Sequence, residues 1–420
     1  MGKRSTFSGI AACVVLAACA APAPPVASKH PWTTYQMNST HNAIVPAAFP
    51  SVRWTINLHS KINGGLAYDG RRLFAVDFAK ELIAIAPRDG RILWKARGDD
   101  VLMSTPIVAQ GLVFVGSGTN AVMTGADGMP MWGRRGGNHW YAFRADNGRL
   151  AWKYATAGES MPSAAYVDGM LLFATGDGVA TAVRADTGQR LWEAPLPGHV
   201  SMASTVVWND LVYFVTTKDE KNHFGPLGNQ TVALDWRTGK RVWSTPYGNS
   251  DCTPTVFGSR VFVEGVRDGP IGPREAIGYN DVVALDSASG ALRWRHVGDQ
   301  GFYSSVGTNE RAIAGTYDNR TLFQSLPATN QLIAFRTADG KVLWSTVTSG
   351  SVKMSPLVWN GRVYAGDTSG VLYAVDERSG KTLRALAFDK PFTSAPPIVI
   401  GRTMFLPQTD SIRALPLGAL

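Results

Sequence analysis

Short stretches in which apolar and polar residues alternate recur along this chain, and many of them lead into a tight-turn sequence. In residues 231–244 the run TVALD is followed by a turn that contains Gly239, and then by the run KRVWS. An alternation with a period of two is typical of a half-buried β-strand, and a glycine after a turn-forming residue is typical of a hairpin. No segment sustains the 3.6-residue period of a helix. The pattern therefore predicts an all-β fold.

One eleven-residue frame repeats through the chain: an alanine, a glycine six residues later and a tryptophan four residues after that. The copies are Ala84–Gly90–Trp94, Ala142–Gly148–Trp152, Ala182–Gly188–Trp192, Ala233–Gly239–Trp243, Ala284–Gly290–Trp294 and Ala334–Gly340–Trp344. A further copy keeps Ala374 and Gly380 but has Arg384 at the tryptophan position. The tryptophans are 40 to 58 residues apart, which is the period of propeller blades. Two more apolar runs precede each copy, so each repeat predicts a blade of four antiparallel strands.

The two ends of the chain complete this pattern. Trp54 has the role of a fourth strand with no first three strands before it, and the C-terminal residues supply three strands with Ala414 at the alanine position. We therefore expect an eight-bladed β-propeller over residues 51–420, with residues 52–57 pairing beside residues 411–415. A ring that is closed by strands from both termini leaves no open sheet edge.

The frame A-x-D-x-x-T-G-x-x-x-W resembles the tryptophan-docking repeat of the PQQ-type (quinoprotein-like) β-propeller superfamily. The copy from Ala233 to Trp243 matches every fixed position of that repeat. The superfamily contains quinoprotein dehydrogenases and also non-enzymatic scaffolds, so the resemblance implies a fold rather than one function. It also implies that the repeated tryptophans pack between adjacent blades and are structural. These residues are Trp54, Trp94, Trp152, Trp192, Trp243, Trp294 and Trp344.

The N-terminus predicts an exported and lipid-anchored protein. Lys3 and Arg4 precede a short apolar run, and the sequence LAAC at residues 16–19 resembles a bacterial lipobox. We therefore interpret residues 1–18 as a lipoprotein signal peptide, Cys19 as the lipidated residue and residues 19–50 as a Pro-rich tether. An ordinary signal peptide with an incidental cysteine is the alternative. Ala20, where an aspartate would signal inner-membrane retention, favours the outer membrane, with the protein facing the periplasm.

Charge and motifs exclude several function classes. The formal net charge is +9, but the basic residues are spread along the chain without a Lys/Arg run, and nucleic acid is not an expected partner. The seven histidines are scattered, and no HExxH, CxxC or CxxCH motif occurs, so we assign no metal ligand and no catalytic residue. One possible function is that of a PQQ-dependent alcohol or sugar dehydrogenase, with PQQ and calcium as cofactors; it is the alternative to the scaffold function described next. Several of those enzymes carry an adjacent Cys–Cys pair, which this chain lacks.

Four long segments favour an interaction scaffold that needs no cofactor. They connect the second and third strands of their blades, and alternating strand directions predict that all four emerge on one face. Long loops on a rigid scaffold often carry binding residues, and aromatic and arginine residues are enriched at interfaces. Packing of these loops on one another over the central channel is the alternative. The predicted partner-binding residues are Trp132, Arg134, Arg135, Phe224, Arg274, Tyr279, Arg320 and Phe323.

An eight-bladed propeller lipoprotein without a recognisable catalytic set is similar to the BamB family, the scaffold lipoproteins of the β-barrel assembly machinery. The resemblance lies in fold, anchor and size. It implies a non-enzymatic, periplasm-facing scaffold that binds periplasmic or outer-membrane proteins, including a β-barrel assembly protein.

Overall fold

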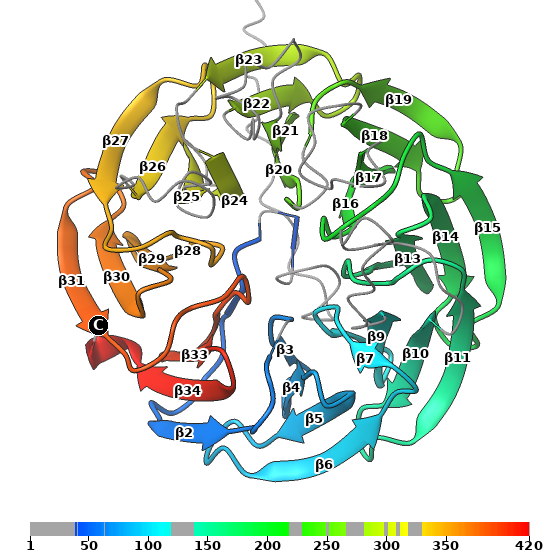
Figure 1. The fold of residues 1–420 in the computed structure, drawn as a ribbon, viewed down its shortest axis with the longest axis horizontal. Helices are drawn as coiled ribbons and strands as arrows, with labels where there is room; N and C mark the ends of the chain where they lie inside the picture. Colours follow the sequence, from blue (N-terminus) through cyan, green and yellow to red (C-terminus); the bar gives the residue numbers. More distant parts are fainter. Residues whose placement is uncertain are drawn as a thin grey trace, which may run out of the picture.

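The computed structural model describes residues 38–39, 41–62, 64–118, 138–217, 229–248, 252–265, 281–297, 301–307, 311–317 and 330–419. Within these residues, small twisted sheets stand side by side around a central axis (Figure 1). In each sheet that is formed by one continuous stretch of chain, the chain starts at the inner strand and moves outward, strand by strand. We call the four strand positions A, B, C and D from the axis to the rim. The fold class predicted from the sequence, an all-β propeller, is confirmed.

Seven blades are each formed by one continuous stretch of chain. Blade 1 contains β3 (Ala67–Tyr68), β4 (Leu73–Val76), β5 (Glu81–Ile85) and β6 (Ile92–Arg97). Blade 2 contains β7 (Val101–Leu102), β8 (Ile107–Ala109), β9 (Leu112–Gly118), β10 (Asn138–Arg144) and β11 (Leu150–Thr156). Blade 3 contains β12 (Ala165–Val167), β13 (Met170–Thr175), β14 (Val179–Arg184) and β15 (Arg190–Pro195). Blade 4 contains β16 (Val206–Trp208), β17 (Leu211–Thr216), β18 (Gln230–Asp235) and β19 (Arg241–Thr245).

The other three continuous blades follow the same order. Blade 5 contains β20 (Thr255–Phe257), β21 (Arg260–Gly265), β22 (Asp281–Asp286) and β23 (Leu292–Val297). Blade 6 contains β24 (Gly301–Gly307), β25 (Arg311–Tyr317), β26 (Gln331–Arg336) and β27 (Val342–Val347). Blade 7 contains β28 (Leu357–Trp359), β29 (Arg362–Gly366), β30 (Val371–Asp376) and β31 (Thr382–Ala387).

The remaining sheet combines both ends of the chain, and we call it the composite sheet. Its strands are β1 (Ile44–Val45), β32 (Ile398–Ile400), β33 (Thr403–Pro407), β34 (Ser411–Pro416) and β2 (Trp54–Asn57), and a short 3₁₀ helix, η2 (Leu417–Ala419), follows β34. β2 pairs with β34 so that Trp54 lies opposite Ala414, and the pairing predicted for residues 52–57 beside 411–415 is present. β1 adds a parallel strand at the inner edge, beside β32.

The prediction of an eight-bladed propeller of four-stranded antiparallel blades, with the ring closed by both termini, is therefore wrong. The structure has seven blades of continuous chain, and the sheet that holds the termini is a five-stranded composite with one parallel pair. Blade 2 also has five strands, because its A position is split into β7 and β8, which both pair with β9. The parallel pair arises because the N-terminal chain runs along the inner edge of the composite sheet before it reaches the rim as β2.

The register explains the alanine and tryptophan of the repeat. In blades 1 to 6, and between β34 and β2, the alanine of the C position lies directly opposite the tryptophan of the D position, for example Ala84 opposite Trp94. In blades 1 to 6 the ladder shifts by one residue immediately after this pair. An alanine is small, so the indole ring beside it has room to lean toward the next blade.

Each docked tryptophan covers the hairpin glycine of the following blade. A Cβ atom at Gly188 would lie less than 3.0 Å from the ring of Trp152, and Gly188 has a φ of +71°. Six indole Nε1 groups also donate to the carbonyl three residues before that glycine. The pairs are Trp54–Pro87, Trp152–Ala185, Trp192–Trp236, Trp243–Ser287, Trp294–Thr337 and Trp344–Glu377, at 2.8–3.2 Å. Only glycine satisfies both constraints at this position, a left-handed φ and close ring contact.

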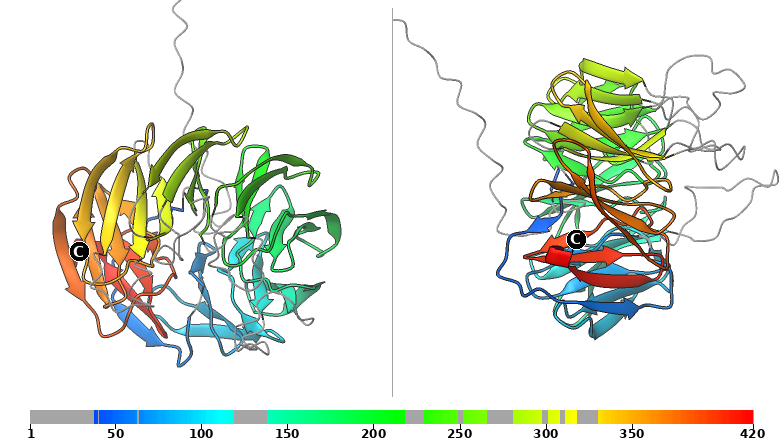
Figure 2. Two further views of the ribbon diagram at one scale, coloured as in Figure 1. Left: turned by 45° about the horizontal axis from the view of Figure 1, so that its top comes forward. Right: turned by 90° about the vertical axis from the view of Figure 1, so that its left-hand side faces the viewer.

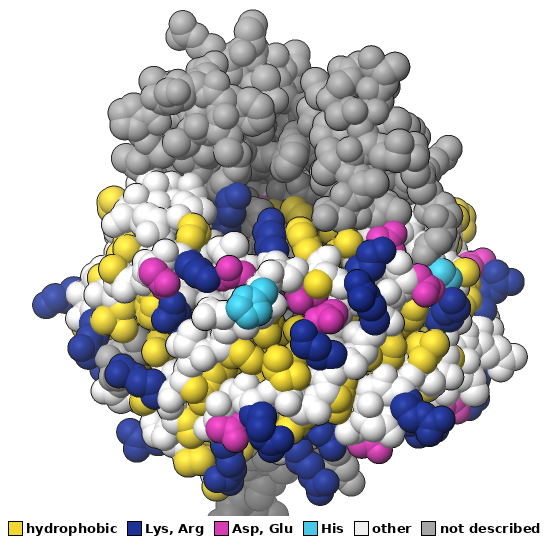
Figure 3. All heavy atoms as spheres, turned by 60° about the horizontal axis from the view of Figure 1, so that its bottom comes forward, with side chains coloured by type: hydrophobic (Ala, Val, Ile, Leu, Met, Phe, Trp, Pro, Cys, Tyr) yellow, Lys and Arg dark blue, Asp and Glu magenta, His cyan; other side chains and the backbone are white. Residues whose placement is uncertain are grey.

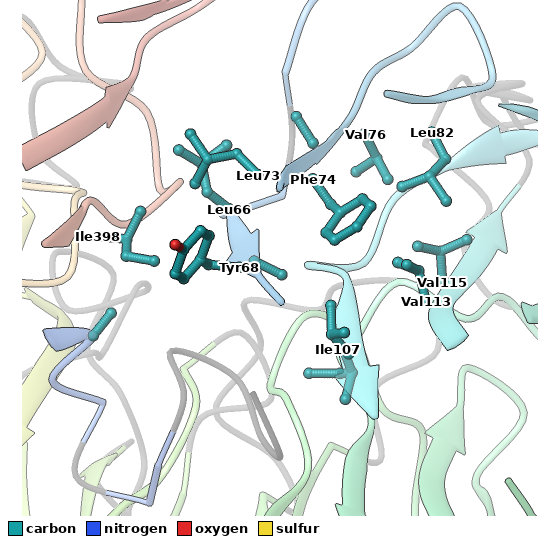
Figure 4. Close-up of a cluster of buried hydrophobic side chains, with 14 of the residues drawn as sticks. Leu66, Tyr68, Leu73, Phe74, Val76, Leu82, Ile107, Val113, Val115 and Ile398 are labelled. Carbon is teal, nitrogen blue, oxygen red and sulfur yellow. The ribbon is translucent and has the colours of Figure 1, made fainter. Parts of the chain in front are cut away.

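The hydrophobic core lies between the blades rather than in one central mass. Figure 4 shows Phe74 and Leu82 of blade 1 on the side of Val113 and Val115 of blade 2, within one cluster of buried side chains. Four smaller clusters join blades 3 and 4, blades 4 and 5, blades 5 and 6, and blades 6 and 7. Each blade is therefore stabilised by the burial of apolar area against its two neighbours.

Trp94 differs from the other docked tryptophans and gives a direct test of the indole hydrogen bond. Its Nε1 is buried without an acceptor, whereas Trp152 Nε1 donates to Ala185 O at 2.9 Å. Both rings are half-buried, and each lies 5.8 Å from a phenylalanine of its own blade. We predict that Trp152→Phe lowers the free energy of unfolding by about 1–2 kcal/mol more than Trp94→Phe does, because only the first change leaves a buried carbonyl unpaired. Urea unfolding of the two variants measures this difference, and equal losses would contradict a role for the hydrogen bond.

Candidate functional site

The residues predicted from the sequence to bind partners lie outside the described residues. Trp132, Arg134 and Arg135 belong to the segment 119–137, and the lipidation position Cys19 lies before residue 38. The others belong to the remaining three long segments. They are Phe224 in 218–228, Arg274 and Tyr279 in 266–280, and Arg320 and Phe323 in 318–329. Their part in binding stays a prediction.

The strands that flank these four segments are described, and their directions place the segments at one end of the blades. β9, β17, β21 and β25 all occupy the B position, and each runs antiparallel to the C strand that follows it. We call the end with the B–C and D–A connections the loop face, and the end with the A–B and C–D turns the turn face. Figure 2 shows the disc from the side, with these two faces to its right and left. The single-face arrangement expected from the sequence follows from this topology.

Hydroxyl side chains link the D–A connections of successive blades on the loop-face side. The backbone N–H of Gly65 donates to Thr105 Oγ1 at 2.7 Å, and the N–H of Thr105 donates to Ser163 Oγ at 2.8 Å. The N–H of Ser163 donates to Ser204 Oγ at 3.1 Å, and that of Ser204 to Thr253 Oγ1 at 2.9 Å. These buried bonds fix the inner ends of blades 1 to 5 against one another.

A segment near the N-terminus lies against the inner strands of three sheets. We call residues 38–39 and 41–45 the N-terminal strap. Ser39 O accepts the N–H of Val256 in blade 5 at 2.8 Å, and the side chains of His41 and Thr255 contact each other at 3.2 Å. Ser39, His41 and Ala43 are at most 6% exposed. The strap therefore covers part of the inner wall of the propeller, where Figure 1 shows the blue chain near the axis.

The strap also joins blade 7 to the composite sheet. The carboxamide of Asn42 donates to Val358 O and accepts from Val358 N–H, both at 2.9 Å. Two and three residues later, Ile44 and Val45 pair with β32. Residues 38–50 belong to the tether expected from the sequence, and within this range β1 pairs with β32. This pairing joins distant parts of the chain, so it cannot be read from local composition.

Two buried aspartates hold equivalent places in blades 1 and 7 but have different partners. Asp367 Oδ2 accepts from the N–H of Gly350 at 2.8 Å and from the hydroxyl of Tyr373 at 3.1 Å. Asp77 Oδ1 accepts the N–H of Glu81 at 3.1 Å, but its Oδ2 is buried without a partner. Ile83 stands where blade 7 has Tyr373. Burial raises the pKa of Asp77 above its ordinary value, because water no longer solvates the charge.

Two lysines, Lys353 and Lys61, lie on the loop face and interact through their charges. Burial lowers the pKa of Lys353, and the charge of Lys61 lowers it further.

Among the described residues, no group of three or more His, Cys, Asp or Glu side chains is arranged to hold a metal ion. In the same part of the chain, no helix has the length and apolar character to cross a membrane.

The residues present do not match the cofactor set that the dehydrogenase alternative would use. That set, by resemblance, includes an adjacent Cys–Cys pair above PQQ. The cysteines of this chain are Cys13, Cys19 and Cys252, and no two are adjacent. Cys252 is buried, at the inner end of blade 5.

Apolar side chains are exposed along the rim, on the outermost strands. Leu93, Leu191, Val242, Leu343 and Leu383 are 37–51% exposed, and each directly precedes the position of the docking tryptophan. Alternation along a strand makes this unavoidable, because a residue next to an inward tryptophan points outward. Figure 3 shows such hydrophobic side chains scattered between Lys and Arg on the rim, without one continuous patch.

Fold and repeat together define a class: this chain is a PQQ-type β-propeller with tryptophan docking between its blades. A family model described as "Outer membrane protein assembly factor BamB" matches residues 47–272 and 278–409. The chain therefore belongs to that family.

Three known proteins show how far the similarity extends. Tetrathionate hydrolase of Acidithiobacillus ferrooxidans is 26% identical over 355 residues, which cover 80% of this chain and 69% of that protein. The outer membrane protein assembly factor BamB of Shewanella oneidensis is 22% identical over 389 residues, covering 87% of this chain and 88% of that protein. The crystal structure of a quinohemoprotein alcohol dehydrogenase from Comamonas testosteroni has a TM-score of 0.67 at 12% identity, covering 92% of this chain and 80% of that chain. That structural likeness shows the fold alone.

Sequence reasoning missed the strap and the unpaired aspartate. Asp77 and Asp367 look alike in the sequence, since both follow a B strand and precede a short turn. The two sites differ in the residue six positions later, which is Ile83 after Asp77 and Tyr373 after Asp367. Only the sheet register shows that this residue lies where it can reach the aspartate. The strap sequence HNAIV is too short to stand out.

We predict that Asp77→Asn raises the free energy of unfolding at pH 7 by about 1 kcal/mol, because a neutral amide costs less to bury than an unpaired carboxylate. The matched variant Asp367→Asn should lower it by about 2 kcal/mol, because an amide NH₂ group would face the donors of Gly350 and Tyr373.

The raised pKa of Asp77 predicts how the stability difference between the wild type and Asp77→Asn changes with pH. A raised pKa means that protonation of Asp77 favours the folded state, so its stabilising effect is full below the ordinary value of 3.8 and is lost as the pH rises through the folded-state value. The advantage of Asp77→Asn over the wild type should therefore shrink as the pH falls from 7 toward 4. Thermal unfolding across this range measures it, and a loss of stability at pH 7 would contradict an uncompensated charge.

Proposed function

We propose that this protein is a non-enzymatic scaffold that binds protein partners in outer-membrane β-barrel assembly. The observation that carries the proposal is the match to the BamB family model over most of the propeller. The match to the Shewanella BamB covers 88% of that protein, nearly its whole length. The topology adds that the four longest B–C segments all leave from the loop face. A rigid disc that carries long segments on one face is suited to hold a partner without chemistry.

The proposal includes a location. The lipobox at residues 16–19 would give a lipid anchor at Cys19, in the outer membrane and facing the periplasm. The partners would then be periplasmic proteins or the periplasmic parts of outer-membrane proteins. No cofactor is required for this function.

A second candidate function is hydrolysis of tetrathionate, and one specific observation favours it. The tetrathionate hydrolase of Acidithiobacillus ferrooxidans is 26% identical over 80% of this chain. The match covers 69% of that enzyme, compared with 88% for the Shewanella BamB. We rank the scaffold first because the family model and the nearly complete coverage agree with it. A PQQ-dependent dehydrogenase ranks third, since its support is the shared fold and a sequence match to a quinoprotein ethanol dehydrogenase that covers 29% of this chain.

Partner capture from membranes tests the scaffold function. We predict that the lipidated chain, purified with detergent after brief cross-linking, retains a β-barrel assembly protein. The triple variant Trp132→Ala, Phe224→Ala and Phe323→Ala should retain at least about fivefold less of it, because aromatic anchors contribute most of the energy of an interface. Its melting temperature should stay close to that of the wild type.

The rim offers a matched control for this experiment. Leu191→Ala, Val242→Ala and Leu343→Ala also remove three exposed apolar side chains, but from the D strands. This control should capture the partner normally. Equal loss in both variants would count against binding by the loops. Turnover of tetrathionate by the purified chain, or saturable stabilisation by PQQ with calcium, would replace the scaffold by the corresponding enzyme.

A further inference from the structure

Charged side chains are distributed very unevenly between the two faces of the disc. On the turn face, counted as the A–B and C–D turns with one strand residue on each side, the described side chains include 18 Lys or Arg and 11 Asp or Glu. On the loop face, counted in the same way over the D–A and B–C connections, they include 5 Lys or Arg and 9 Asp or Glu. The described part of the molecule is therefore positive on one face and negative on the other.

The contrast is larger when only exposed side chains are compared. On the turn face, 15 of the 18 basic residues are exposed but only 6 of the 11 acidic ones. Several of the other carboxylates are used inside the turns. Asp235, Asp286 and Asp376 each accept two backbone N–H groups and one side-chain hydroxyl of their own turn. Hydrogen bonding to Arg293 lowers the pKa of Asp286 to about 2, so this carboxylate is ionised but already paired.

The exposed basic residues are spread around the whole face. The C–D turns of six blades, all except blade 5, carry at least two of them when flanking strand residues are included. In blade 4 these include Lys240 and Arg241, and in blade 7 they include Arg378 and Lys381. β19 and β31, next to these turns, lie in blades that are well separated around the ring (Figure 1). Among the hydrogen bonds and ion pairs of the described residues, none is made by the four cationic groups named here.

From this distribution we infer that the turn face is an electrostatic docking surface for an anionic phospholipid bilayer. A ring of cationic groups at the tips of hairpins presents many charges in one plane. A membrane surface is also a plane, so it can contact groups on opposite sides of the disc at once, whereas an acidic peptide would contact one sector. Basic residues near an anionic bilayer are attracted to it within about one Debye length.

The negative charge on the described part of the loop face makes the attraction directional. A disc with opposite charges on its two faces turns its positive face toward an anionic surface. The loop face, with its four long segments, would then point away from the bilayer. This inference rests on charge and topology, and it does not require the scaffold function proposed above.

Vesicle binding tests the inference. The full-length chain would carry Cys19→Ser, so that an acyl anchor cannot contribute. We predict that it co-sediments with phosphatidylcholine vesicles that contain about 30 mol% phosphatidylglycerol, but not with pure phosphatidylcholine vesicles, and that 0.5 M salt abolishes the binding. Lys240→Glu with Arg241→Glu, and separately Arg378→Glu with Lys381→Glu, should each weaken binding about threefold or more. The four changes together should weaken it at least about tenfold.

The loop face provides the matched control, Lys61→Glu with Arg97→Glu, since both residues are exposed there. This pair should change vesicle binding by less than about twofold. Glutamine in place of glutamate at the four turn-face positions gives a milder set that should also weaken binding, and melting temperatures verify that each variant is folded. Equal losses in the control, or binding that ignores phosphatidylglycerol, would overturn the inference. Two further outcomes would overturn it. One is a loss of vesicle binding from only one of the two turn-face pairs, and the other is binding of polyaspartate through the turn face without any vesicle binding. Either result would assign the surface to an acidic protein.

Discussion

The contact of an indole ring with the hairpin glycine of the next blade is the interaction on which the rest of the structure depends. Every part of the repeat serves it. The alanine opposite the tryptophan leaves room for the ring, the glycine accepts both a left-handed backbone and the ring above it, and the carbonyl three residues earlier accepts the indole N–H. Because the contact is made between blades, no single blade is an independent unit, and the hydrophobic clusters lie between neighbouring blades for the same reason.

One joint of the ring lacks this contact. Blade 7 has Arg384 at the tryptophan position, and the composite sheet that follows it has no C–D hairpin, since its C and D strands are β34 and β2 from the two ends of the chain. The N-terminal strap crosses the same joint from the inside, with Asn42 on β28 and β1 on β32. At this joint, the aromatic docking near the rim is missing, and the strap instead connects the two sheets near the axis. The strap links the start of the propeller to its last blades.

The two faces of the disc have separate physical characters. The loop face carries the hydroxyl-linked D–A connections, the buried aspartates and the attachment points of four long segments. The turn face carries short hairpins whose glycines and aspartates are used for folding, which leaves mainly basic side chains exposed. A scaffold that holds a partner on one face and meets an anionic surface with the other would use both properties. Family membership and topology support the first part, and charge supports the second.

The sequence by itself determined the strand periodicity, the blade repeat, the docking tryptophans and the family, because these depend on residue type and spacing along the chain. It also placed β2 beside β34, since Trp54 and Ala414 each lacked the other half of the repeat. Only the tertiary structure decided which sheets have five strands, where the strap runs and which buried aspartate has partners. Those features depend on register and on contacts between residues hundreds of positions apart, such as Asn42 and Val358, and no local pattern encodes them. The uneven charge of the two faces depends on both the sequence and the tertiary structure. The basic residues are spread one by one along the sequence, and the alternating strand directions bring them to one face.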